Sequence, residues 1–137
     1  MSTQEDGLKG RIEAIEAAYE FMLAYAAQGL SGEEGSGSTA EVREQLHRSD
    51  KALEGLTELL KSVTKGKKIK SADTYHAFIE VMNRDLVAAQ AAIRLVLAQR
   101  IISSQLIDNL NALIHLRALL TDLFLIDEVL KLSEAPG

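Results

Sequence analysis

The chain has 137 residues, of which 47% are hydrophobic and 26% are charged, and its formal net charge is −5. This length fits one globular domain that buries its own core, and the absence of cysteine excludes a disulfide scaffold, thiol chemistry and cysteine-ligated zinc. The acidic balance argues against nucleic acid as a partner, because only the lysine-rich residues 61–70 would attract its phosphates.

No segment of the sequence has the pattern of a membrane or secretory element. Residues 1–10 are polar and acidic, unlike the apolar centre of a secretory signal. The longest apolar runs, such as residues 123–126, fall far short of the roughly 20 residues that span a bilayer. We therefore expect a cytoplasmic protein that does not enter the membrane.

The first predicted helix covers residues 8–28. Its apolar residues alternate in steps of four and three, which returns them to one face of an α-helix: Leu8, Ile12, Ile15, Tyr19, Met22 and Ala26. The following residues, 29–38, are rich in glycine and serine, so we predict a flexible loop there, whose Gly-Ser-Gly-Ser portion could be natural or an engineered remnant.

The second predicted helix covers residues 39–65. Ser38 and Glu41 have the spacing of a capping box at its start, and Gly66 is placed to end it in the left-handed conformation. The same three-four spacing continues through this range: Val42, Leu46, Ser49, Leu53, Leu56, Leu60 and Val63. The short link that follows predicts an antiparallel neighbour.

Residues 71–132 contain neither glycine nor proline. One helix over this range would be about 90 Å long, too long for a compact domain of this size. Ser103 and Ser104 could cap a new helix, so we predict helices over 72–101 and 105–132 with a turn near 101–104. The sequence thus predicts a single all-α domain over 1–137, a mostly antiparallel four-helix bundle with the Gly/Ser loop between its first two helices.

The last predicted helix is apolar on more than one face, which indicates two packing partners. One face can pack on the other helices, and the second needs either the far side of the bundle or another subunit. We predict that a second copy of the chain contacts this helix through five residues: Leu116, Leu119, Leu123, Ile126 and Leu130.

Three pairs of polar residues could bind a ligand or a metal. Glu44 and His47 have the Glu-x-x-His spacing of di-iron bundles, but the nearest second copy, Asp73 and His76, would lie about 20 Å away across an antiparallel pair. His76 and Glu80 could reach one ion, although a surface pair explains them equally. His115 and Arg117 could bind an anionic ligand or fix the register of a subunit contact.

No coherent set of catalytic residues stands out, and no motif calls for a cofactor. The leading functional hypothesis is a small non-enzymatic interaction module, an adaptor, regulator or assembly chaperone, that forms homo-oligomers and binds a further protein. The alternative is a ligand- or metal-binding bundle, possibly a small enzyme, that uses His76, Glu80, His115 and Arg117.

Overall fold

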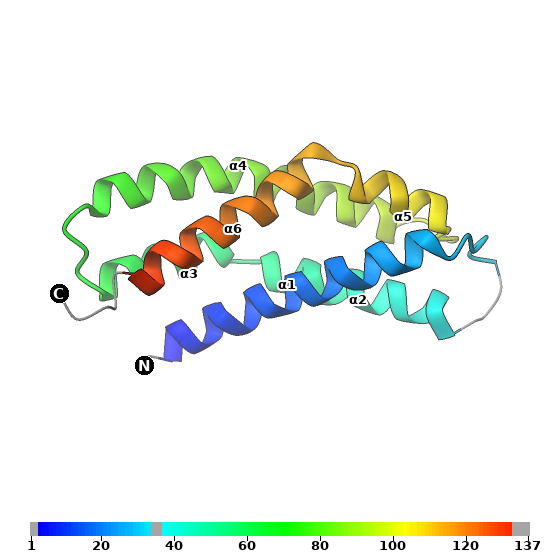
Figure 1. The fold of residues 1–137 in the computed structure, drawn as a ribbon, viewed down its shortest axis with the longest axis horizontal. Coiled ribbons are helices and arrows are strands. Elements are labelled where there is room, and N and C mark those ends of the chain that lie inside the picture. Colours follow the sequence, from blue (N-terminus) through cyan, green and yellow to red (C-terminus); the bar gives the residue numbers. More distant parts are fainter. Residues whose placement is uncertain (1–2, 34–36, 133–137) are drawn as a thin grey trace.

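The computed structural model describes residues 3–33 and 37–132, which form six α-helices and, within those ranges, no strand (Figure 1). The helices are α1 (Thr3–Ala27), α2 (Gly37–Leu53), α3 (Leu56–Gly66), α4 (Ala72–Leu97), α5 (Ser104–Asn111) and α6 (Ile114–Leu132). The all-α prediction is confirmed. The predicted count of four differs, because the ranges 39–65 and 105–132 each contain two helices.

The helices lie lengthwise beside one another around one apolar core. α1 packs on α2 and α5, whereas α4 packs on α6 and α3 and runs antiparallel to α6 (Figure 1). Every helix contributes buried side chains to the core, among them Met22, Leu46, Leu60, Met82, Ile107 and Leu119. The three-four spacing seen in the sequence therefore marks the faces that meet in this core.

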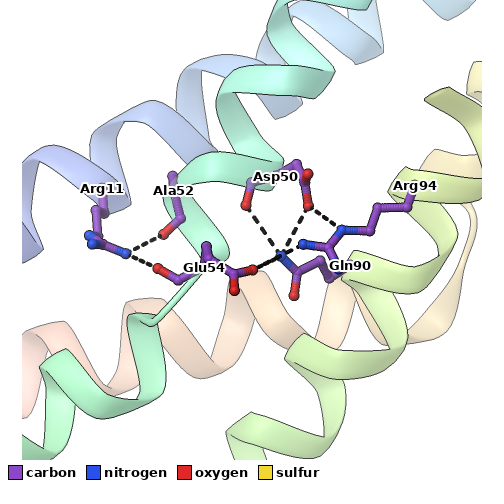
Figure 2. Close-up of polar contacts among 6 residues, drawn as sticks. All are labelled: Arg11, Asp50, Ala52, Glu54, Gln90 and Arg94. Atoms are coloured by element: carbon purple, nitrogen blue, oxygen red, sulfur yellow. Dashed lines mark hydrogen bonds and ion pairs between the residues drawn. The ribbon is translucent and has the colours of Figure 1, made fainter.

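The break between α2 and α3 lies at Gly55, whose φ of 73° is left-handed. A break frees backbone carbonyls, and the Arg11 guanidinium of α1 donates hydrogen bonds to those of Ala52 and Glu54 (Figure 2). The sequence analysis missed this break because the apolar spacing continues through it, with Leu53 and Leu56 both buried. Gly55 is the signal that could have revealed it.

Two side chains of α4 also contact residues next to this break, on the side opposite to Arg11. Gln90 Nε2 donates to Asp50 Oδ1 and to Glu54 Oε2, both at 3.0 Å (Figure 2). Arg94 forms ion pairs with the same two carboxylates, at 2.9 Å to Asp50 and 3.0 Å to Glu54. These ion pairs raise the pKa of Arg94 above its usual value, chiefly through the hydrogen bond to Asp50. The cluster therefore ties the end of α2 and the residue before the break to α4.

Replacing Arg11 with methionine is expected to lower the free energy of unfolding by about 1–2 kcal/mol, because two backbone carbonyls lose their donor while the apolar stem is kept. Urea denaturation measures this change. Lys9→Met, on the exposed side of the same helix, is the matched control and should change stability by less than about 0.5 kcal/mol. Equal effects of the two substitutions would show that the carbonyl contacts contribute nothing.

The turn between α4 and α5 covers residues 98–103 and overlaps the turn that the sequence predicts near 101–104. Ser103 caps α5, its hydroxyl accepting a hydrogen bond from the Leu106 amide at 3.0 Å. Arg43 of α2 donates to the carbonyls of Leu97 and Gln99, at 3.0 and 2.8 Å, near the end of α4. These contacts satisfy groups that a helix end leaves unpaired.

Hydrogen bonds connect the end of α1 to this turn. Tyr25 Oη donates to the Ile102 carbonyl at 2.6 Å, and Ser104 Oγ donates to the Tyr25 carbonyl at 2.6 Å. The Leu30 amide donates to Ser104 Oγ at 2.9 Å, and the Ser104 amide donates to the Leu30 carbonyl at 2.9 Å. This contact orders the chain just beyond α1, within the range predicted to be a flexible loop. Residues 34–36 of that range lie outside the described part.

The break between α5 and α6 falls at residues 112–113 and involves neither glycine nor proline. Next to it, the buried Asn111 donates from Nδ2 to the Met22 carbonyl of α1 at 3.1 Å. This bond ties α5 to α1, while α6 packs mainly on α4. The two helices thus have different partners, and the break lets each follow its own.

Four helix ends differ from the sequence predictions, and one of them is the end of α4, at Leu97 rather than residue 101. α1 begins at Thr3, earlier than residue 8, because its first turn places Glu5 and Asp6 near the positive end of the helix dipole. α2 begins at Gly37, so Ser38 lies inside the helix and does not cap it. Gly66 closes α3, and the left-handed residue is Lys68, with a φ of 53°.

Candidate functional site

The five residues predicted to contact a second copy all face the core of their own chain. Leu116, Leu119, Leu123, Ile126 and Leu130 are between 0 and 4% exposed. Their spacing matches the face of α6 that packs inward. They are therefore occupied by contacts within the chain, and a partner that meets α6 would have to contact other residues.

The outward face of α6 carries a second stripe of residues in steps of three and four. Ile114, Leu125 and Leu132 are 71, 53 and 64% exposed, which is unusual for three large apolar side chains on one stripe. The intervening positions of the stripe are polar and exposed: Arg117, Thr121 and Glu128. We call these six residues the outer stripe.

Apolar side chains widen the outer stripe on both of its sides. Phe124 of α6 is 52% exposed and Val81 of α4 is 48% exposed. Val81 lies one turn from Asp85 on α4, and Leu125 lies one turn from Asp122 on α6. Because the two helices are antiparallel (Figure 1) and these two aspartates meet, Val81 and Leu125 are at a similar level along the helix pair, about one turn from the aspartates.

Two carboxyl groups meet between α4 and α6, at Asp85 and Asp122. Asp122 Oδ2 is buried and has no hydrogen-bond partner within residues 3–33 and 37–132. Burial and the neighbouring Asp85 together raise the pKa of Asp122 to about 7, because a protonated Asp122 can donate a hydrogen bond to Asp85 and an ionised one is repelled by it. His115 Nδ1 lies 3.5 Å from Asp85 Oδ1.

The sequence analysis missed both aspartates, although a signal for them exists. Asp85 shares a stripe of α4 with Phe78, Val81 and Ala88, and Asp122 shares one of α6 with Ala118, Leu125 and Val129. A carboxyl at the middle of an otherwise apolar stripe has to be partly buried when the stripe packs. Two such stripes on helices that pack together indicate a carboxyl pair.

The four predicted ligand residues are spread over two places. Glu80 forms an ion pair with Lys61 at 2.6 Å, and this contact lowers the pKa of Glu80. His76 has a buried Nε2 atom without a partner within the described ranges. His115 contacts Asp85, about 13 Å along α4 from His76 at the helical rise, and Arg117 lies on the outer stripe. The two pairs therefore do not form one site.

Metal ligands do not gather in the described part of the chain. Among residues 3–33 and 37–132, no three histidine, aspartate or glutamate side chains stand in an arrangement that could hold a metal ion. Asp85, Asp122 and His115 are not such a group, although they lie close together. The raised pKa of Asp122 indicates that the two aspartates share a proton instead.

A shallow groove of about 330 Å³ runs between α1, α3 and α6. Its floor is apolar and its rim is charged, with Leu8, Ile12, Val63 and Leu130 below and Glu16, Lys67 and Lys131 among the residues above. Both acidic and basic side chains line the groove, so it does not favour a ligand of one charge.

No protein-family model, curated protein sequence or solved structure matches this chain. In the described ranges, every helix is too short or too polar to cross a membrane. The functional argument therefore depends on the surfaces of the molecule itself.

Proposed function

We propose that this chain is a small non-enzymatic interaction module that self-associates through the outward face of α6 and works in the cytoplasm as an adaptor, regulator or assembly chaperone. In this proposal the fold is an antiparallel four-helix bundle in which two of the helices are broken. One broken helix consists of α2 and α3, and the other consists of α5 and α6. A second copy of the chain is one partner, and another protein is the client or target.

The observation that carries the proposal is the exposed apolar surface of α6. This helix already buries six large apolar side chains against its own chain, yet Ile114, Phe124, Leu125 and Leu132 remain 52 to 71% exposed. Apolar surface exposed to water costs free energy, and four large apolar side chains exposed on one helix are more than the single exposed residues that monomeric proteins commonly show. Covering it by association recovers that free energy.

A ligand-binding bundle is the competing proposal, and it receives less support. It requires His76, Glu80, His115 and Arg117 to converge, whereas Lys61 engages Glu80 and Asp85 engages His115. Arg117 belongs to the exposed outer stripe. An anion held by these groups would have to bridge two separate parts of the surface.

Self-association is expected in sedimentation equilibrium as a monomer–dimer equilibrium between micromolar and hundreds of micromolar protein. Leu125→Gln should raise the dimer Kd about 100-fold, because each of two copies loses about 1.5 kcal/mol of apolar burial and about 1.4 kcal/mol is tenfold. Leu23→Gln is the matched control, since Leu23 of α1 is 48% exposed against 53% for Leu125. A wild-type protein that stays monomeric over the whole range contradicts the proposal.

A further inference from the structure

The six residues of the outer stripe are arranged symmetrically about position 123. Ile114 and Leu132 lie nine residues before and after it, and Thr121 and Leu125 lie two residues before and after it. Arg117 lies six residues before this position and Glu128 lies five residues after it. The one-residue difference corresponds to about 1.5 Å along the helix, which long side chains span easily.

The two charges of the outer stripe are both exposed and opposite in sign. Within residues 3–33 and 37–132, neither Arg117 nor Glu128 forms an ion pair. They lie at opposite ends of α6, so they cannot neutralise each other within one chain. A partner that brings the opposite order of charges would satisfy both.

We propose that two copies of the chain pair through antiparallel α6 helices, with a twofold axis near residue 123 that places Arg117 of each copy opposite Glu128 of the other. This inference rests on the proposed function and specifies its partner and register. The same symmetry places Ile114 opposite Leu132 and Thr121 opposite Leu125, so apolar contacts fall at both ends of the interface.

The charge order disfavours the parallel alternative. Two parallel α6 helices in register would put Arg117 against Arg117 and Glu128 against Glu128, and like charges in contact oppose association. A protein of different sequence has no reason to match this inverted order, whereas a second copy matches it by symmetry. The occupant that the surface fits is therefore another copy of the chain.

The size of the surface sets the strength of the dimer. The 19 residues of α6 give a face about 28 Å long and about 11 Å wide, roughly 300 Å² per copy, which Phe124 and Val81 extend at its sides. This area is below the roughly 800 Å² per partner of a standard stable interface. The dimer should therefore be reversible and form at micromolar concentrations.

Charge reversal tests the register in sedimentation equilibrium. Arg117→Glu and Glu128→Arg should each raise the Kd of self-association about tenfold, because both ion pairs of the dimer become repulsive. The double variant Arg117→Glu/Glu128→Arg should return to within about threefold of the wild-type value. Mixing the two single variants should also restore association, since one copy then carries two acids and the other two bases on the stripe.

The outcomes separate this inference from the proposed function. If the wild-type protein dimerises but the single variants dimerise equally well, or if neither the double variant nor the mixture recovers, the antiparallel register is wrong and self-association stands. If the wild-type protein is monomeric at hundreds of micromolar, both fail together. Circular dichroism melts of all variants should match the wild type, because both side chains are exposed.

Discussion

Replacing Asp122 with asparagine is expected to raise the free energy of unfolding by about 2 kcal/mol at pH 8 and by much less at pH 4. The reason is the position of Asp122 between α4 and α6, where burial and the neighbouring Asp85 both oppose its negative charge. Asparagine is never ionised, and its amide can donate to the Asp85 carboxylate. The substitution therefore places a neutral hydrogen-bond donor beside Asp85 at every pH, as the protonated carboxyl group does at low pH.

The pH window follows from the two pKa values of Asp122. The pKa is 3.8 as a free side chain and about 7 in the folded protein, so the folded state binds the proton more tightly. This contribution to stability is fully present below pH 3.8, declines as the pH rises, and is gone above about pH 7. The whole shift would correspond to about 4 kcal/mol, and partial solvent exposure reduces the expected effect to about half of that.

Urea denaturation of the wild type and of Asp122→Asn between pH 4 and pH 8 measures this difference. The two curves of stability against pH should diverge as the pH rises and run parallel above pH 7. Glu20→Gln removes an exposed carboxylate of α1, outside the outer stripe, and should follow the wild type. A constant difference between Asp122→Asn and the wild type across the range would mean that Asp122 has an ordinary pKa.

The aspartate pair also shows where the sequence stops being informative. The apolar stripes predicted which faces of the helices meet, and the core follows them in α1 and α4. The stripes did not reveal that Asp85 and Asp122 meet, because this depends on the relative shift of α4 and α6 along their axes. That shift is set by the turn at 98–103 and by the break at 112–113, and periodicity alone does not give it.

The two helix breaks were missed for a related reason. Periodicity reports the average direction of a helix, and Leu53 and Leu56 keep the same buried face although the backbone turns between them. The contacts that stabilise the break come from Arg11, Gln90 and Arg94, which are far away in the sequence. The turn before α5 was predictable because its cap, Ser103, is local.

The interface prediction selected the face of α6 that packs inward on its own chain. Sequence analysis reads the most regular apolar stripe first, and in α6 that stripe belongs to the core of the chain. The outer stripe mixes Ile114, Leu125 and Leu132 with polar residues, so it is less visible in the sequence. Only burial distinguishes the stripe that the chain covers from the one that it leaves exposed.

Replacing Gly32 with alanine is expected to lower the free energy of unfolding by about 3 kcal/mol. Gly32 has a φ of +84°, and a Cβ atom there would lie 2.5 Å from the Ile102 carbonyl oxygen and 2.7 Å from its carbon. The Ile102 carbonyl cannot yield freely, because it accepts the hydrogen bond from Tyr25 Oη. The added methyl group must therefore displace the backbone before α5, the loop after α1, or both.

Gly29→Ala is the control that separates the two contributions to the loss of stability in Gly32→Ala, the steric overlap of the new Cβ and the strain of a left-handed backbone. Gly29 has a similar φ of +66°, but nothing lies within 4 Å of the place where its Cβ would be. Its substitution should cost only the left-handed conformation, about 1 kcal/mol. Urea denaturation gives both values, and hydrogen exchange of the Ser104 amide, which donates to the Leu30 carbonyl, should accelerate more in Gly32→Ala. Equal stabilities of the two alanine variants would show that Gly32 does not closely approach the Ile102 carbonyl. The contact between α1 and the α4–α5 turn would then depend on the hydrogen bonds of Tyr25 and Ser104 alone.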